Sequence, residues 1–360
     1  MTNSRISRRR LMQAGGAAAW TTAAAPAAPG LGMGVEGPNT PKLCMGAGGN
    51  VTEAGMRRWK QIGIDHLLMG GPPIPWQEAE IRSRMERLKA GGLTLANMMI
   101  VGFPKAIYGK PGRDEEIEKV QQSIRAAGRA GLPVVEYNFY AHRAVEGYFE
   151  EPGRGGAGMT SFDNDRIKDL PPLPEEGAHS LEEMWSNVAY FLKAVAPVAQ
   201  ESHVRLALHP NDPPPPMSRE SGQIMGSLAG WKRLVDIVKS PSNGITFDCG
   251  VTRELGEDPV EVARYFGARD CINHVHFRNV RTYVPRLKYT EVFPDEGEVN
   301  MFAVMKELVR QKYPRLVYPE HPRVLDADRE QAGAGRGGGY AGFVYNVGYA
   351  RAMLQAAMAS

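Results

Sequence analysis

Residues 205–210 read Arg-Leu-Ala-Leu-His-Pro, a short apolar run that ends on a histidine. The same design recurs three times further along the chain, in runs that end on Cys249, His276 and Glu320. About 30 to 45 residues separate these runs, which leaves room for one helix and its loops. This period predicts a parallel α/β barrel, because such a barrel delivers functional side chains at the carboxyl ends of successive strands.

Short apolar runs alternate with amphipathic patterns eight times in all. We expect strands over residues 43–46, 66–69, 93–100, 134–138, 205–209, 244–249, 272–277 and 316–319. We expect helices near 52–62, 75–90, 114–130, 180–202, 227–239, 259–266, 301–312 and 343–357. An open, doubly wound sheet is the alternative, but no Gly-x-Gly-x-x-Gly follows the first strand. The fold class predicted is therefore α/β, a single-domain (β/α)8 TIM barrel over residues 42–360.

Composition supports an ordinary globular core, with 42% apolar residues. The formal charge of +3 comes from the N-terminus: without the four arginines of residues 1–28, basic and acidic residues nearly cancel. No basic surface for nucleic acid is expected. Three cysteines are few for a disulfide-dependent protein.

The N-terminus resembles an export signal. Ser7-Arg8-Arg9-Arg10-Leu11-Met12-Gln13 fits the twin-arginine pattern, and a mild, Ala-rich run follows over residues 14–28. That run is too short and too weakly apolar to span a membrane stably. We expect residues 1–28 to be a twin-arginine signal peptide, 29–41 a linker, and the mature protein periplasmic with no membrane span; a disordered basic tail is the alternative.

The four residues at the strand ends are candidate metal ligands: His209, Cys249, His276 and Glu320. A lone histidine near a strand end is more often structural, but four such residues on four consecutive strands converge on one point. A thiolate argues against Mg²⁺ and Ca²⁺ and favours Mn²⁺, Fe²⁺, Co²⁺, Ni²⁺ or Zn²⁺. The chain is thus predicted to be a metalloenzyme.

Two connections are unusually long, residues 139–179 and 322–342. Long connections in compact domains are usually functional or disordered, and on a barrel both would lie at the catalytic face. We expect lids there. The glycine-rich run 333–339 lacks the Lys-Ser/Thr of a phosphate-binding P-loop.

The segment His209-Pro-Asn-Asp-Pro-Pro214 resembles the His-Pro-Asp-Asp-Pro-Pro signature of mannonate dehydratases, in the xylose-isomerase-like barrel superfamily. The resemblance continues to the C-terminus. It departs from the family at Asn211, which replaces an aspartate, and at Glu320, which replaces a shorter Asp ligand. A family histidine also has no match in Phe293-Pro-Asp-Glu-Gly297, and the loop after the fourth strand differs.

The resemblance implies the same four metal ligands, with Mn²⁺ or Fe²⁺ as the expected cofactor. It implies that His321 and Tyr340 are the acid–base pair and that Arg278 contacts the substrate. From the residues alone, Arg278 could instead form a buried ion pair with Glu136 or Asp248, Tyr340 could be a loop aromatic, and His321 could support the metal site. Further expected substrate contacts are Glu136, Asn138, Asn211 and Asp212.

The activity that this implies is dehydration of a D-mannonate-like aldonate to a 2-keto-3-deoxy acid, a hydro-lyase reaction. A metal-dependent sugar isomerase or epimerase of the same superfamily is the alternative. A non-catalytic exported sugar-binding protein would predict a defective ligand set, and the set is intact. The expected partner is a small sugar acid or sugar, and a homo-oligomer is left open.

Overall fold

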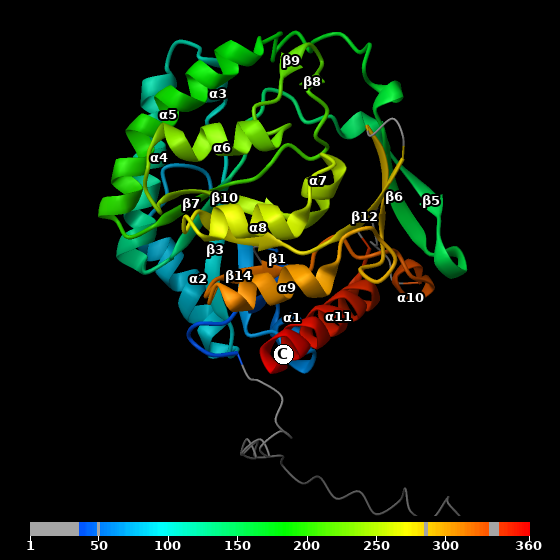
Figure 1. Ribbon diagram of the computed structural model, residues 1–360. Coiled ribbons are helices and arrows are strands. Elements are labelled where there is room, and N and C mark those ends of the chain that lie inside the picture. Colours follow the sequence, from blue (N-terminus) through cyan, green and yellow to red (C-terminus); the bar gives the residue numbers. More distant parts are fainter. Residues whose placement is uncertain (1–35, 49–50, 284–286, 331–337) are drawn as a thin grey trace, which may run out of the picture. The chain divides into compact units, whose positions relative to one another are not determined.

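The computed structural model describes residues 36–48, 51–283, 287–330 and 338–360. The predicted signal peptide, most of the linker and most of the glycine run lie outside these residues. Eight parallel strands close into a barrel in the order β1-β14-β11-β10-β7-β4-β3-β2 (Figure 1). They are β1 (Lys42–Ala47), β2 (His66–Gly70), β3 (Thr94–Ile100), β4 (Val134–Tyr137), β7 (Arg205–Leu208), β10 (Asn243–Asp248), β11 (Ile272–His276) and β14 (Leu316–Tyr318). The predicted TIM barrel is confirmed.

Each predicted helix is present around the barrel. They are α1 (Glu53–Gln61), α2 (Glu78–Ala90), α4 (Arg113–Ala130), α5 (Leu181–Glu201), α6 (Leu228–Ile237), α8 (Pro259–Gly267), α9 (Met301–Arg310) and α11 (Tyr340–Ala359). Side-chain caps fix several starts: Ser180 and Glu183 form a reciprocal capping box at α5. Three short helices were not predicted, α3 (Pro104–Tyr108), α7 (Cys249–Glu254) and α10 (Asp326–Arg329).

The core lies between the strands and the helices. Along a strand, successive side chains point to opposite faces. In β11, the fully buried Val275 belongs to the apolar core, whereas His274 and His276 share the opposite face of the strand, the barrel interior. Burying an apolar side chain of this size contributes about 1.5–3 kcal/mol. The helices therefore hold the barrel from outside and leave its interior face free for polar groups.

A second sheet forms beside the barrel mouth, and we call it the mouth sheet. It consists of β5 (Tyr148–Pro152), β6 (Gly158–Asp163), β12 (Asn279–Tyr283) and β13 (Lys288–Val292), in the antiparallel order β12-β13-β6-β5 (Figure 1). The short 3-10 helices η2 (Val145–Gly147), η3 (Arg154–Gly156) and η4 (Asn164–Arg166) flank β5 and β6. Phe162, Val280 and Tyr289 give the sheet an apolar core of its own. Much of the segment 139–179, expected to be a lid loop, is thus regular structure.

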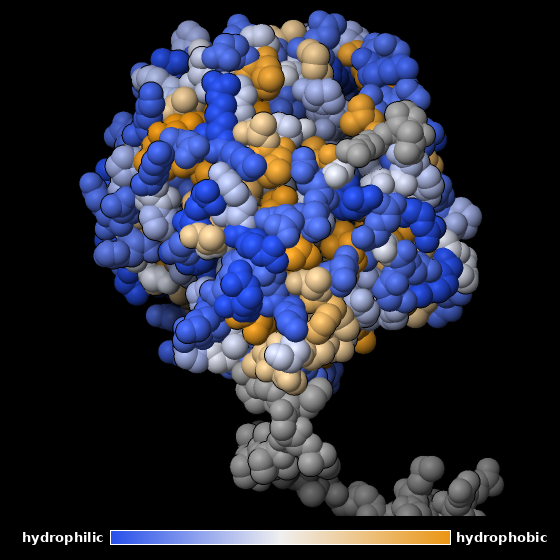
Figure 2. Space-filling view, viewed as in Figure 1, coloured by the Kyte–Doolittle hydropathy of each residue, from blue (hydrophilic) through white to orange (hydrophobic). Residues whose placement is uncertain are grey.

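A hairpin of β8 (Met217–Ser218) and β9 (Ser221–Gly222) follows the proline-rich turn after β7. None of the helices among the described residues is long and apolar enough to cross a membrane. The face drawn in Figure 2 is mainly hydrophilic, and weakly hydrophobic residues gather near the C-terminal end of α11.

Candidate metal centre and active site

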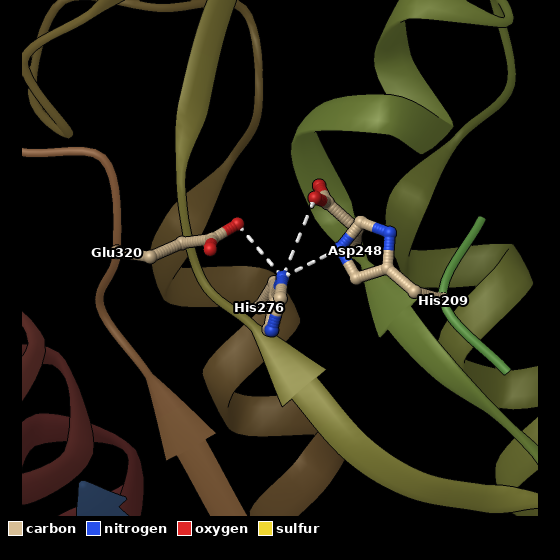
Figure 3. A group of neighbouring side chains, drawn as sticks. All are labelled: His209, Asp248, His276 and Glu320. Atoms are coloured by element: carbon tan, nitrogen blue, oxygen red, sulfur yellow. Dashed lines mark hydrogen bonds and ion pairs between the residues drawn. The ribbon is translucent and has the colours of Figure 1, made fainter. Parts of the chain in front are cut away.

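Three of the four predicted ligands meet at the carboxyl ends of the strands, together with Asp248 (Figure 3). The possible ligand atoms of His209, Asp248, His276 and Glu320 all lie within 4.8 Å of one another. The Nδ1 atom of His276 is central: it lies 2.8 Å from Glu320 Oε1, 3.0 Å from His209 Nε2 and 3.9 Å from Asp248 Oδ2. We call these four residues the metal cluster.

The protons in this cluster are too few for its acceptors. His209 Nδ1 lies 2.7 Å from the carbonyl oxygen of Pro210, so Nδ1 carries the proton and Nε2 presents a lone pair. That lone pair and the carboxylates of Asp248 and Glu320 gather around His276 Nδ1, which offers one proton at most. A divalent transition metal fits this arrangement, because imidazole nitrogens and carboxylate oxygens are its usual ligands.

Charge in the surroundings agrees with a cation at this point. The buried carboxylates of Asp212, Asp248, Glu254, Glu291 and Glu320 outnumber the buried guanidinium groups of Arg278 and Arg323. Burial raises the pKa of Asp248, against the lowering effect of Arg278, and it raises the pKa of Glu254 well above its ordinary value. Burial lowers the pKa of His276, but the carboxylate of Glu320 outweighs it, so the net shift is upward.

The structure does not bring Cys249 into the metal cluster. The carboxylate of Asp248 accepts a hydrogen bond from Val251 N (2.8 Å) and caps α7, so Cys249 is the first residue of a helix and the strand ends one residue earlier than predicted. The Cys249 thiol faces the carbonyl oxygens of His276 (3.4 Å) and Arg278 (3.2 Å). Burial, and then the charge of Asp248, raises the pKa of this thiol.

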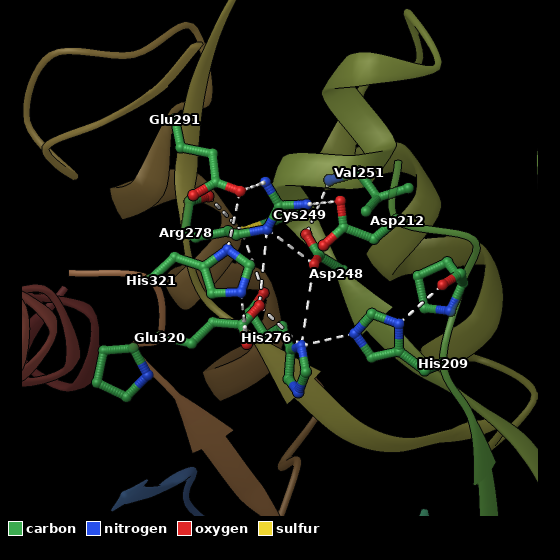
Figure 4. A network of polar contacts seen from close by, with 12 residues as sticks. His209, Asp212, Asp248, Cys249, Val251, His276, Arg278, Glu291, Glu320 and His321 are labelled. Atoms are coloured by element: carbon green, nitrogen blue, oxygen red, sulfur yellow. Dashed lines mark hydrogen bonds and ion pairs between the residues drawn. The ribbon is translucent and has the colours of Figure 1, made fainter. Parts of the chain in front are cut away.

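Arg278 lies at the centre of a buried ionic network (Figure 4). Its Nε donates to Asp248 Oδ2 (2.9 Å) and its Nη1 to Glu254 Oε1 (2.7 Å), while Nη2 lies 3.4 Å from Asp212 Oδ1. A Cβ atom on Gly250 would come within 2.8–2.9 Å of this side chain, so only glycine leaves room for it. The buried ion pair with Asp248, the alternative to substrate contact, is what the structure contains.

His321 lies beside the metal cluster and contacts Glu291 of the mouth sheet. Its Nδ1 is 3.0 Å from Glu291 Oε1, and its Nε2 is 3.5 Å from Glu320 Oε2. Arg323, almost fully buried, donates to the carbonyl (2.8 Å) and carboxylate (2.9 Å) of Glu291. Burial opposes protonation of His321, but Glu291 and Glu320 raise its pKa to about 9. Glu291 was not among the predicted site residues, because it lies on the mouth sheet, whose strands were not predicted.

Asp212 joins the proline-rich turn to the mouth sheet. Its Oδ1 accepts hydrogen bonds from the hydroxyls of Tyr148 (2.8 Å) and Tyr289 (3.2 Å), and its carbonyl accepts one from Arg143 Nε (2.8 Å). Charge from Arg278 and Arg143 outweighs burial and holds the pKa of Asp212 below its usual value. The residue is 2% exposed, so it supports the mouth of the barrel.

The other predicted substrate contacts differ in position. Asn211 is buried and ties its turn to the next segment, donating to Gln223 Oε1 (2.6 Å) and accepting from Met225 N (2.8 Å). Asn138 follows the end of β4 and is partly exposed. Glu136 is 1% exposed and lies inside the barrel, with its Oε1 3.5 Å from His276 Nε2. It stands behind the metal cluster.

Tyr340 begins α11 and lies over the end of β1. Its hydroxyl donates to the carbonyl of Arg58 (3.1 Å), and its ring packs against Trp59 with centroids 5.7 Å apart. It lines a cavity of about 560 Å³ that also includes Gly46 and Phe343. Within the described part of the chain, the hydrogen-bond and ring partners of Tyr340 include neither His321 nor a member of the metal cluster. The two predicted acid–base residues are not brought together.

A closed parallel barrel with two imidazoles and two carboxylates at its mouth defines a metal-binding (β/α)8-barrel enzyme. The sequence matches the family model described as D-mannonate dehydratase (UxuA) over residues 45–174 and 173–360. The chain belongs to the D-mannonate dehydratase family, a family of hydro-lyases, and the predicted resemblance is confirmed.

Two individual relatives carry the name of the same enzyme. The chain is 30% identical over 297 residues to a mannonate dehydratase of Thermotoga petrophila, covering 72% of this chain and 81% of that protein. It is 29% identical over 280 residues to that of Streptococcus equi subsp. zooepidemicus, covering 71% and 77%.

One solved structure belongs to the same family, and another shares only the fold. The mannonate dehydratase of Streptococcus suis serotype 2 superimposes with a TM-score of 0.81 at 26% identity, covering 89% of this chain and 94% of that one. An L-ribulose 3-epimerase gives a TM-score of 0.56 at 13% identity, covering 89% and 96%. The latter likeness extends to the fold alone.

Proposed function

We propose that this protein dehydrates a sugar acid of the D-mannonate class to a 2-keto-3-deoxy acid, with a divalent metal, Mn²⁺ or Fe²⁺, as cofactor. The observation that carries the proposal is the position of His321, whose Nε2 lies 3.5 Å from a carboxylate of the metal cluster. A proton-transfer group and a metal centre are thus neighbours, as elimination next to a carboxylate requires. Family membership supplies the substrate class.

The metal would be held by His209, Asp248, His276 and Glu320. When bound, it would act as a Lewis acid that makes the proton α to the substrate carboxylate more acidic. Elimination breaks that C–H bond and the C–O bond of the β-hydroxyl, which leaves as water. The enol that remains tautomerises to the 2-keto acid.

The chain supplies proton transfer through His321. Glu291 occupies Nδ1 of that imidazole, so Nε2 is the atom that can exchange a proton with the substrate. Arg278 and Arg323 hold Asp248 and Glu291 in place from the protein side. Tyr340 as the second acid–base residue stays a prediction, since its hydroxyl is engaged by Arg58.

The experiment that tests this proposal compares two substrate classes with metal-loaded protein. D-mannonate should give a product lighter by one water, with the absorbance of an α-keto acid, in a reaction that EDTA abolishes. His203→Asn, at the opposite end of the barrel before β7, is a matched control for His321→Ala and should keep full activity. A product of unchanged mass from a ketose or aldose, with no turnover of any aldonate, would establish the isomerase or epimerase instead.

We also propose that residues 1–28 direct export by the twin-arginine route, with a periplasmic mature protein. The support is the motif around Arg8 and Arg9 with its mild apolar run. That route carries folded proteins, which allows metal loading before export. Whether the mature chain forms a homo-oligomer stays a prediction that light scattering on the purified protein would decide.

A further inference from the structure

A carboxylate lies inside the barrel, beneath the metal cluster, without any guanidinium or ammonium partner among the described residues. Glu136, on β4, is 1% exposed, and the cationic groups nearest to it are imidazoles. Removing a carboxylate from water is unfavourable, because the charge loses its hydration. A buried carboxylate in such a place needs a role, and the groups that it contacts are side chains of the barrel interior.

The orientation of this carboxylate is fixed from two other strands. Asn97 Nδ2, on β3, donates to Glu136 Oε2 (2.9 Å), and Thr246 Oγ1, on β10, donates to Oε1 (2.8 Å). Both donors are fully buried. The same Oε1 lies 3.5 Å from His276 Nε2, which is the ring nitrogen that the metal cluster does not use.

The two nitrogens of His276 therefore face different partners. Nδ1 faces His209, Asp248 and Glu320, whereas Nε2 faces Glu136. When a metal takes the Nδ1 lone pair, the ring proton lies on Nε2, where the carboxylate of Glu136 faces it. Metal-binding imidazoles commonly donate their second N–H to such a partner, which fixes the tautomer and the ring orientation.

We propose that Glu136 is a positioning residue that holds His276 in the Nε2–H tautomer and thereby prepares Nδ1 as a metal ligand. The proposal rests on the proposed metal centre but not on the identity of the substrate. It assigns Asn97 and Thr246 the task of aiming Glu136. His274, one layer deeper on β11, offers a ring nitrogen within 4.8 Å of Glu136 and His276, but neither of its ring nitrogens has a hydrogen-bond partner among the described residues.

The test distinguishes the role of Glu136 as a hydrogen-bond acceptor from the space that its side chain fills. Glu136→Met fills the space but removes the acceptor, whereas Glu136→Gln keeps an acceptor oxygen toward Nε2. The amide group of Gln can be accommodated because the buried Oδ1 of Asn97 has no hydrogen-bond partner among the described residues, so Asn97 can turn that oxygen toward it. Glu136→Gln should thus keep the metal affinity that Glu136→Met loses. A role of Glu136 in packing alone would not predict that difference.

Two readouts are needed, both independent of catalysis. In Zn²⁺-loaded full-length protein, ¹⁵N–¹H spectra of the imidazoles should show a protected Nε2–H of His276 in wild type and in Glu136→Gln, but not in Glu136→Met. Competition with a chromogenic chelator should show Co²⁺ affinity lowered about 10- to 100-fold by Glu136→Met and much less by Glu136→Gln. Asn273→Ala is the control: this buried residue of β11 binds the Leu206 carbonyl (2.7 Å) and should leave Co²⁺ affinity unchanged.

If Glu136→Met does not fold, Thr246→Val tests the same contact by freeing Oε1, and Co²⁺ affinity should fall there too. An Nε2–H signal of His276 that stays equally protected, together with Co²⁺ affinity within twofold of wild type, in Glu136→Met or in Thr246→Val, would overturn the proposal. Wild type that binds no Co²⁺ would refute the metal centre on which the proposal rests. A wild-type protein that binds Co²⁺ yet turns over no aldonate would refute the proposed substrate alone.

Discussion

His321 and Glu291 lie 3.0 Å apart, Nδ1 to Oε1, although Glu291 comes from the mouth sheet and His321 from the segment after β14. His321 has a positive φ of 47°, an uncommon conformation for a residue with a side chain. The ion pair and the Arg323 contacts hold that conformation. The proposed proton transfer by His321 would thus depend on a sheet that does not belong to the barrel.

The His321–Glu291 pair predicts how stability changes with pH in metal-free protein. The pKa of His321 is raised from 6.5 to about 9, so its contribution is fully present below pH 6.5 and is lost as pH rises through about 9. We expect the difference in unfolding free energy between wild type and His321→Gln to shrink over that range. Urea titrations at a series of pH values would measure it, and a difference independent of pH would contradict the pair.

His321→Ala should lower the rate of aldonate dehydration by about 10²- to 10⁴-fold, the usual contribution of a positioned proton-transfer group. Metal content should not change, because His321 is not a member of the metal cluster. Steady-state kinetics and metal analysis on the same preparation check both statements. Loss of metal in proportion to activity would make His321 a support of the metal site instead.

His276→Ala should remove both metal and activity while the barrel stays folded, since the apolar core lies on the other side of the strands.

Asp248 and Cys249 are neighbours in the chain, and of the two only Asp248 belongs to the metal cluster. We expect Asp248→Asn to lower metal affinity strongly and Cys249→Ser to change it little, because the thiol faces two carbonyl oxygens. The opposite order in chelator competition would favour the thiolate ligand predicted from the sequence.

Arg278→Met should destabilise the protein by about 3–5 kcal/mol, because it leaves buried carboxylates without their cation. Arg278→Lys keeps the charge but cannot reach Asp248 and Glu254 together, so it should fall between wild type and Met. Lys168→Met removes an exposed pair with Asp165 and should leave stability nearly unchanged. Urea midpoints compare the three, and a small effect of Arg278→Met would point to a role in substrate contact alone.

Replacing Arg8 and Arg9 by Lys should leave the precursor in the cytoplasm, since the apolar run that follows is a weak signal by itself. Cell fractionation followed by immunoblotting measures the distribution. Unchanged periplasmic yield would count against the twin-arginine route.

Much of this architecture could be predicted from local sequence. The barrel strands are short apolar runs, and their carboxyl ends bear His209, His276 and Glu320, which the structure brings together. Asp248 was missed because the strand was extended by one residue, to Cys249. The signal was present: an Asp followed by Cys-Gly-Val can cap a helix, which ends the strand at the aspartate.

The remaining parts depend on contacts between distant segments. Glu291 and Tyr289 lie on β13, which pairs with β12 and with the distant β6, and no local pattern announces the pairing with β6. Likewise, the burial of Arg278 follows from the carboxylates of three other segments, so its residue type alone was compatible with substrate contact. Tyr340 was assigned by resemblance, and the structure gives its hydroxyl a backbone partner.

The mouth sheet has a consequence for how such enzymes can diversify or be redesigned. Its strands come from two insertions, one after β4 and one after β11, yet they share ladders and an apolar core. Grafting either insertion alone from a homologue would leave an unpaired edge on its partner and disturb the residue that holds His321. The two segments depend on each other for their structure, and a chimera that alters selectivity at this barrel would have to include both.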